Sequence, residues 1–426
     1  MSAFDKIIGY DAIKEDLLQI CDMIRNPQMY KNLGAKLPHG ILLDGAPGLG
    51  KTLIAKCFIE ESGLKAYTIR RTRSSDDFIE EITDTFQDAK DNAPSIVFLD
   101  DMDKFANEDD MHCDAEEYVA VQAGIDEVRG SDVFVIATVN ESGKLPRSLK
   151  RSGRFDRRIK IRRPNEADAE RIIRHYLSDK KVSENVNMED LTKMISYSSC
   201  AELETILNEA AVNAAYLRKD SMEMQDLVKA VLRMQYGAPG NYSSLPEDDK
   251  ARIALHEAGH ITVCEVLCPG SVGLASVRSS GWGDCGGFIH SCSELPKNSL
   301  QALVSLAGKA AVEMYYADSC ASGCSDDISG AANIIRTEMT ELASRGFAMV
   351  DVTNHMFNEA SESMNARNES VVQAELERYM LKARDILIKN RAFLEKLTAA
   401  LIEKDTLLYS DIKNIRESFS IVPAYF

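Results

Sequence analysis

Residues 45–52 read Gly-Ala-Pro-Gly-Leu-Gly-Lys-Thr, the spacing of a phosphate-binding loop. An apolar run at 40–44 precedes this loop, and a helical pattern covers 53–61 after it. This strand, loop and helix constrain the fold strongly, because the glycines must let backbone N–H groups wrap a phosphate at the positive end of the helix. We expect the loop to bind ATP through Gly45, Pro47, Gly48 and Gly50, with Lys51 at the β- and γ-phosphates and Thr52 at Mg²⁺.

Further apolar runs at 66–69, 96–99, 133–137 and 159–161 follow the loop, and helical stretches at 76–90 and 115–129 lie between them. Strands that alternate with helices favour a parallel sheet with helices on both faces. The first part of the chain is therefore predicted to be an α/β domain.

Polar side chains at the ends of two of these strands complete a predicted ATP site. Asp100 is expected to bind Mg²⁺ through water, Asp101 to polarise the attacking water, and Asn140 to position water or the γ-phosphate. Arg154 and Arg157 come later and would serve the γ-phosphate of a neighbouring subunit. The alternatives are two solvated acids at a strand end and two surface salt bridges.

A second motif, His256-Glu257-Ala258-Gly259-His260, lies in an apolar helical context. Residues four apart share one helix face, so both imidazoles can converge on one Zn²⁺ ion, and Glu257 between them can act as general base on a water. Zinc needs a third protein ligand. Spacing alone leaves five downstream candidates open: His290, Asp318, Asp326, Asp327 and His355.

The composition excludes several classes of protein. A net charge of −17 argues against nucleic acid as a partner, and no apolar run reaches the roughly 18 residues of a membrane span. The first twenty residues mix charged and apolar types, unlike a secretory signal. Ten cysteines in a chain of 426 residues favour a reducing cytoplasm, and the pairs at 264 and 268 and at 320 and 324 are read as buried thiols.

From 166 onward the pattern becomes helical, with short helices predicted at 166–178, 188–196, 201–217 and 223–235. Gly, Pro and Ser then crowd the stretch that follows, which favours a linker. Beyond it the chain is predicted to be mostly helical, apart from a Gly-rich piece at 270–292. The predicted organisation is a nucleotide-binding domain, a helical lid, a linker and a mainly α-helical zinc peptidase domain, at 1–163, 164–236, 237–249 and 250–426.

In the order of these parts the chain resembles the FtsH-type AAA metalloproteases, from Phe4-Asp5-Lys6-Ile7-Ile8-Gly9-Tyr10-Asp11 through both motifs. The resemblance implies a homo-hexameric ring that hydrolyses ATP to unfold and degrade unfolded or misfolded proteins. It also implies that Ile8 and Gly9 touch adenine, that Asn140 is the polar sensor and that Arg154 and Arg157 are arginine fingers. Gly323-Cys324-Ser325-Asp326-Asp327-Ile328 matches the family's third-ligand stretch, which selects Asp327. Residues 286–289 resemble the edge strand along which substrate would lie.

The chain differs from the family pattern in four respects. It begins near the start of the ATPase domain, so the chain is read either as a cytoplasmic relative or as a fragment of a membrane-anchored protein. Asp101 replaces the usual glutamate, and Cys200 replaces a glycine of the lid. The aromatic-valine-glycine pore loop is not found; the shorter segment 70–80 has Phe78 as its only aromatic.

These differences leave three functions open. The first is an ATP-dependent zinc endopeptidase. The second is a zinc peptidase whose slow ATPase serves assembly or gating, and the third is a remodelling protein with weak proteolysis.

Overall fold

The computed structural model describes most of the chain and divides it into two compact units. One unit comprises Met1–Asp179 with Tyr197–Thr205, and the other comprises Lys180–Ser196 with Ile206–Phe426. The domain boundaries expected from the sequence remain predictions. The described residues are 2–71, 75–106, 115–151, 153–238, 247–279, 286–293, 295, 298–316, 324–340 and 362–424.

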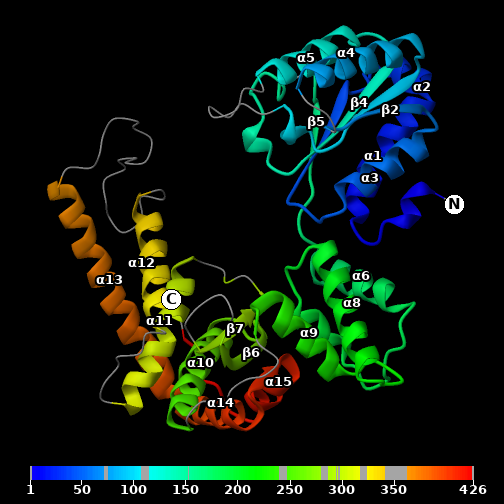
Figure 1. Ribbon diagram of the computed structural model, residues 1–426. Coiled ribbons are helices and arrows are strands. Elements are labelled where there is room, and N and C mark those ends of the chain that lie inside the picture. The colour runs from blue at the N-terminus through cyan, green and yellow to red at the C-terminus, as the bar shows by residue number, and fades with distance from the viewer. Residues whose placement is uncertain are drawn as a thin grey trace. The chain divides into compact units, whose positions relative to one another are not determined.

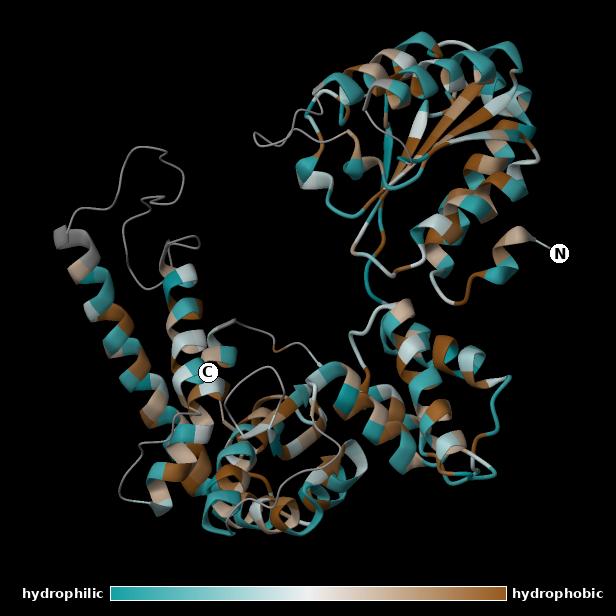
Figure 2. Ribbon diagram, viewed as in Figure 1, coloured by the Kyte–Doolittle hydropathy of each residue, from teal (hydrophilic) through white to brown (hydrophobic). Residues whose placement is uncertain are grey.

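The first unit is built on a five-stranded parallel sheet, which confirms the α/β class (Figure 1). The strand order is β2-β3-β4-β1-β5, so β1 lies between β4 and β5. The strands are rich in apolar residues, as Figure 2 shows, because both faces of a parallel sheet are covered. Their bounds are β1 (Gly40–Asp44), β2 (Lys65–Ile69), β3 (Ser95–Leu99), β4 (Val133–Val139) and β5 (Arg157–Lys160).

Two hydrophobic cores lie on opposite faces of this sheet. One contains Leu17 from α1 (Asp11–Arg25) and Phe58 from α3 (Lys51–Ser62). The other contains side chains of α4 (Ser75–Asp91) and α5 (Ala115–Glu127). The helix α1 was not predicted from the sequence. Short elements complete the unit: η1 (Ala3–Lys6), α2 (Pro27–Asn32), η2 (Met102–Lys104) and η3 (Ser142–Lys144).

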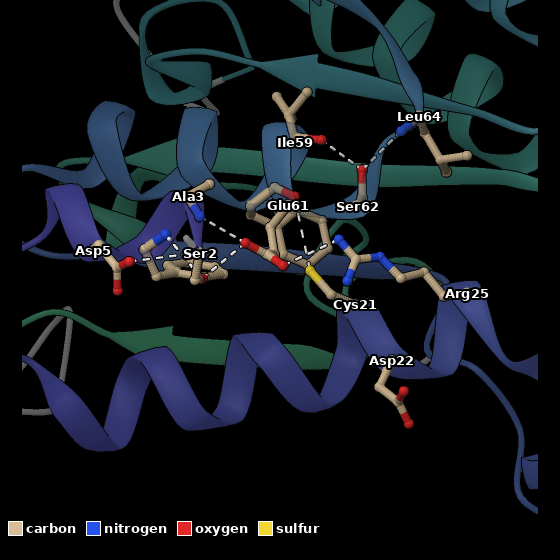
Figure 3. Close-up of polar contacts among 12 residues, drawn as sticks. Ser2, Ala3, Asp5, Cys21, Asp22, Arg25, Ile59, Glu61, Ser62 and Leu64 are labelled. Carbon is tan, nitrogen blue, oxygen red and sulfur yellow. Dashed lines mark hydrogen bonds and ion pairs between the residues drawn. The ribbon is translucent and has the colours of Figure 1, made fainter.

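Glu61 at the end of α3 fixes the N-terminal segment (Figure 3). Its carboxylate accepts hydrogen bonds from the Ser2 hydroxyl and the Ala3 N–H at 2.8 and 2.7 Å, and from Arg25 of α1 at 3.1 Å. These charge-assisted contacts tie η1 to the helix that carries the phosphate-binding loop. Ile7, which follows η1, belongs to the same buried core as Leu49 of the loop.

Four helices follow the sheet, close to the predicted ranges. They are α6 (Glu166–Leu177), α7 (Met188–Met194), α8 (Cys200–Tyr216) and α9 (Met224–Tyr236). Asn165 caps α6 by accepting from the Asp168 N–H, and Asn187 caps α7 in the same way. Gly237, with φ of 59°, ends α9 in the left-handed conformation that favours glycine.

The described part of the chain beyond α9 is mostly helical, as predicted. Its helices are α10 (Glu247–Leu267), α11 (Asn298–Tyr315), α12 (Cys324–Thr340), α13 (Glu362–Lys389), α14 (Arg391–Lys404) and α15 (Tyr409–Glu417). The Gly-rich piece supplies β6 (Val272–Ser279) and β7 (Gly286–Ser291), which form an antiparallel sheet of order β7-β6-β8 with β8 (Thr406–Leu408). Among the described helices, none is long and apolar enough to cross a membrane.

The helix α10 packs closely against α11 because position 259 is glycine. A Cβ at Gly259 would lie 2.6 Å from the Ala307 carbonyl oxygen and 2.7 Å from the Ala311 Cβ. The shared core of this unit includes side chains from α10, α11, α12, α13 and α14. This packing holds α10 rigidly next to α11 and α12.

Candidate functional site

The predicted phosphate cradle lies at the carboxyl end of β1, between the ends of β4 and β5. Gly48 and Gly50 have φ of 78° and 83°, which glycine adopts without strain. The Lys51 ammonium is buried and donates to the Ala46 carbonyl at 2.8 Å and to Asn140 Oδ1 at 2.9 Å. Burial lowers the pKa of Lys51, and nearby acids, Asp101 first, oppose the shift. The donors and the turn fit a bound nucleotide phosphate.

Thr52 and Asp100 meet at the same edge of the sheet. The Asp100 Oδ1 atom accepts hydrogen bonds from the hydroxyls of Thr52 and Thr138, each at 2.9 Å. A hydroxyl and a carboxylate oxygen are the ligands that Mg²⁺ prefers. Arg70, at the end of β2, places its Nε atom 4.0 Å from Asp100 Oδ2, a contact that the sequence did not predict.

Asp101 is held by the turn that follows β3. It has φ of 54°, and its N–H donates to the Thr138 hydroxyl at 2.8 Å. Its Oδ2 atom forms an ion pair with Lys104 at 2.6 Å. Lys104 was not predicted as part of the site, although its spacing of three residues from the acid places the two side chains within one helical turn.

Ile8 and Gly9 lie in a turn fixed by α6. Gly9 has φ of 74°, and a Cβ there would meet Asp168 Oδ1 at 2.7 Å. The Tyr10 N–H donates to the same carboxylate at 3.4 Å, and the Tyr10 hydroxyl lies 3.7 Å from the Cys200 sulfur. Cys200, which replaces the lid glycine, therefore contacts Tyr10, the residue that follows the pair predicted to touch adenine.

The two predicted arginine fingers have different surroundings. Arg154 forms a two-pronged ion pair with Asp126, at 2.9 Å from Nε and 2.6 Å from Nη2, and this hydrogen bonding raises its pKa. Arg157 is exposed on β5. Both lie within the first unit, and their action on a neighbouring subunit remains a prediction.

Phe78, the aromatic residue of the segment at 70–80, is fully buried. Its ring packs edge-to-face against Phe105, with centroids 5.3 Å apart. A core side chain cannot grip a substrate, so Phe78 does not replace the family's pore aromatic. Residues 72–74 of this segment lie outside the described residues.

His256, His260 and Asp327 come together from α10 and α12. The Asp327 Oδ2 atom lies 3.0 Å from His256 Nε2 and 3.3 Å from His260 Nε2, and the two nitrogens are 3.0 Å apart. Ligands of a tetrahedral zinc at about 2.0–2.1 Å would be roughly 3.3 Å from one another. Among the described residues these three form the cluster that could hold a metal ion. The donor set therefore fits Zn²⁺.

Two residues that sequence analysis missed shape this cluster. The Nδ1 atom of His260 lies 2.8 Å from the Val304 carbonyl oxygen on α11, so Nδ1–H donates there and leaves the Nε2 lone pair for a metal. Gly308 of the same helix faces both rings. A Cβ at Gly308 would lie 2.5 Å from the Nε2 atoms of His256 and His260.

Glu257 is buried on the same helix, 4% exposed. Burial raises its pKa to about 8; His260 opposes this shift and Asp327 adds to it. Gly287 of β7 has φ of 94°, and a Cβ there would lie 2.4 Å from Glu257 Oε1. The backbone of β7 thus lies against the predicted general base.

Burial and mutual hydrogen bonds shift the pKa values of His256, His260 and Asp327. Burial lowers the pKa of His256. Burial would also lower the pKa of His260, but its hydrogen bond to Asp327 and the two nearby carboxylates raise it to about 9. Hydrogen bonds from both histidines hold the pKa of Asp327 below its usual range in spite of burial. A metal ion would take the place of the shared proton.

Of the other four ligand candidates, the two that the structure describes are not part of this cluster. Asp326 is exposed on α12. His290 lies on β7 between the Tyr236 hydroxyl, 2.6 Å from Nδ1, and the Ser196 hydroxyl, 3.0 Å from Nε2. Asp318 and His355 lie outside the described residues.

The described cysteines are free thiols. Cys264 and Cys324 are buried, as the sequence predicted, whereas Cys268 is partly exposed; Cys320 lies outside the described residues. The Cys324 sulfur lies 4.0 Å from His256 Nδ1, where it packs beside the histidine.

Comparison with known proteins covers both predicted sites. Residues 41–163 match the ATPase family associated with various cellular activities (AAA), and residues 243–415 match Peptidase family M41. The ATP-dependent zinc metalloprotease FtsH of Streptobacillus moniliformis is 31% identical over 98% of this chain and 64% of its own length. The proteins of the same name from Leptotrichia buccalis and Rickettsia felis are 29% and 30% identical over 97% of this chain.

The chain spans 56% of the Leptotrichia buccalis relative and 69% of the Rickettsia felis relative. The similarity runs across both the phosphate-binding loop and the histidine motif. By its matched regions and its relatives, this chain belongs to the FtsH family of ATP-dependent zinc metalloproteases.

Proposed function

We propose that this chain is an ATP-dependent zinc endopeptidase that unfolds and degrades proteins in a hexameric ring. The observation that carries the proposal is the convergence of His256, His260 and Asp327 beside the buried Glu257. The proposed substrates are unfolded or misfolded proteins, and the proposed cofactors are Zn²⁺, ATP and Mg²⁺. The free thiols are in keeping with a reducing cytoplasm.

The chemistry at this site divides between the metal and the chain. A zinc ion held by the three ligands would lower the pKa of a bound water and polarise the peptide carbonyl. The Glu257 carboxylate would accept a proton from the attacking water and pass it to the leaving amide nitrogen. Burial excludes bulk water from Glu257, so its carboxylate is a stronger base than an exposed one.

At the second site Lys51, Thr52 and Asp100 would hold the phosphates and Mg²⁺. Asn140 would position the γ-phosphate or the water, and Asp101 would polarise the water. Arg154 and Arg157 would act on the site of the neighbouring subunit.

A slower variant of this function has specific support. Asp101 has a shorter side chain than the family's glutamate and is paired with Lys104 at 2.6 Å. Phe78 is buried and unavailable to a substrate. The second candidate is therefore a zinc peptidase whose slow ATPase serves assembly or gating.

Digestion of casein with and without ATP separates these functions. The endopeptidase should degrade casein only with ATP, whereas the gated peptidase should also cleave without hydrolysis, when a non-hydrolysable analogue is bound. Glu257→Gln should retain zinc and abolish cleavage in both cases. Cleavage at the wild-type rate by Glu257→Gln would overturn the zinc-peptidase assignment.

A further inference from the structure

The end of α9 lies on the strand β7 (Figure 1). The ring of Tyr236, the last residue of this helix, stacks on Phe288 with centroids 4.0 Å apart and 14° between the planes. Both rings are half-buried. The two rings bury apolar surface against each other, so the end of α9 is in direct contact with the strand.

His290 lies two residues after Phe288 on the same face of β7, and both of its ring nitrogens form hydrogen bonds. The Tyr236 hydroxyl donates to Nδ1 at 2.6 Å, and Nε2–H donates to the Ser196 hydroxyl at 3.0 Å. Burial lowers the pKa of His290 to about 4, which keeps the ring neutral and able to accept from Tyr236. One histidine thus joins β7 to two segments that precede the α10 helix.

The segment on the Ser196 side is itself anchored. Asp190 of α7 accepts hydrogen bonds from the N–H and the hydroxyl of Ser410 on α15, each at 2.7 Å. The Lys193 carbonyl oxygen lies so close to β6 that a Cβ at Gly273 would be 2.3 Å from it. The segment that contains Ser196, to which His290 is hydrogen-bonded, is therefore anchored to α15 and β6.

The contact between Tyr236 and Phe288 is one residue along β7 from the contact between Gly287 and Glu257. Phe288, which carries the stack, follows Gly287, whose α-carbon faces Glu257 Oε1. Within the described strands β7 pairs only with β6, so its other edge presents main-chain groups to which an extended peptide can add. Tyr236 therefore contacts the strand next to the point where its backbone lies against Glu257.

We propose that Tyr236 and His290 are positioning residues for peptide binding, which fix the substrate-binding edge of β7 against Glu257. The inference rests on the proposed peptidase function. It deepens that function by making the end of α9 part of the peptide site, so that a movement of α9 changes peptide affinity directly.

The test compares Tyr236→Phe, Tyr236→Ala and His290→Gln with a matched control. Tyr236→Phe keeps the ring stack and removes the hydroxyl, while Tyr236→Ala removes both. Tyr315→Phe is the control, because it also removes the hydrogen bond of a tyrosine hydroxyl. The Tyr315 hydroxyl, at the end of α11, donates to Glu395 at 2.8 Å. Each variant is assayed with a short unstructured fluorogenic peptide, and zinc content is measured alongside.

A hydrogen bond of this kind is typically worth about three- to tenfold in an equilibrium constant. We expect KM to rise by about that factor in Tyr236→Phe and His290→Gln and by more in Tyr236→Ala, with kcat nearly unchanged. In the Glu257→Gln background, where the peptide is bound but not cut, fluorescence anisotropy should show the same loss of affinity. Tyr315→Phe should match wild type in both measurements.

Unchanged KM and peptide affinity in Tyr236→Phe would overturn the proposal, even if Tyr236→Ala fails to fold. A fall in zinc content or in kcat alone would also overturn it, because the pair would then support the metal site and not the strand. Failure of the proposed function gives a different result: wild type would then show no zinc-dependent cleavage of the peptide.

Discussion

At the scale of single residues, the third zinc ligand is decided by the direction of two neighbouring side chains. Asp327 faces His256 and His260, whereas Asp326 is exposed on α12. Adjacent helical residues point about 100° apart, so one of them alone can face the ion. We predict that Asp327→Ala loses zinc and that Asp326→Ala keeps it, as measured by mass spectrometry of the purified proteins. Zinc loss in Asp326→Ala alone would reverse the assignment.

Gly308 gives a second test of the metal site. A Cβ there would lie 2.5 Å from both histidine Nε2 atoms, in the space that an ion must occupy. Gly308→Ala should therefore lower zinc affinity at least tenfold, measured by competition with a chelator. Gly330→Ala on α12 is the matched control, because a Cβ there meets nothing within 4 Å. Equal zinc affinity in the two variants would contradict this account of Gly308.

Asp101 allows a prediction about ATP turnover. Its carboxylate is one methylene shorter than the family's glutamate, and a misplacement of about 1 Å can cost roughly a hundredfold in rate. We expect Asp101→Glu to raise the steady-state ATPase rate at saturating ATP, with Lys51→Ala as the blank. A clear fall would mean that the turn with φ of 54° and the Lys104 ion pair are built around the shorter acid.

At the scale of elements, the burial of His290 on β7 predicts a dependence of stability on pH. Burial lowers its pKa to about 4 in the folded chain, against an ordinary value near 6.5. The unfolded chain therefore binds more protons than the folded chain between these values, and stability should fall as the pH drops from about 6.5 toward 4.

Urea unfolding at pH 7.5 and at pH 5.5 measures this effect. The midpoint should fall further in wild type than in His290→Gln, because glutamine does not titrate. Contributions from the zinc-site histidines are present in both proteins and cancel in the comparison. An equal fall in both would show that His290 is not the group responsible.

The sequence predicted most elements because their signals were local. The five strands of the first unit overlap apolar runs, most of them separated by helical patterns, and the phosphate-binding loop and the histidine motif have fixed spacing. The helix α1 was missed, although Leu17, Ile20 and Cys21 form its buried face. Phe78 could not be placed, because its partner Phe105 is distant in sequence.

The residues of the candidate site that were not predicted are placed by tertiary packing. His256 and His260 are found by spacing, but Val304 and Gly308 approach them only through the packing of α11, and Gly287 approaches Glu257 only through the packing of β7. Spacing left His290 open as a ligand, and its hydrogen bonds to Tyr236 and Ser196 are tertiary contacts that no local pattern encodes. The choice of Asp327 came from the family resemblance and not from the residues alone.

At the scale of the whole molecule, Arg154 and Arg157 should act between subunits. Mixing inactive Lys51→Ala subunits with inactive Arg157→Ala subunits should partly restore ATPase activity, because some interfaces would pair an intact loop with an intact arginine. Light scattering with ATP present should detect the ring. A protein that stays monomeric with ATP would rule out this arrangement.

In the described part of the chain, the edge of β7 that does not pair with β6 would offer main-chain N–H and C=O groups to an added strand, and apart from proline every amino acid carries both groups. Selection at such an edge would depend on whether a segment is extended and has its amides available, and much less on its side chains. A polypeptide would thus become a substrate when a segment of it loses its own secondary structure. Segments rich in proline, which lacks the N–H, would be the ones that escape.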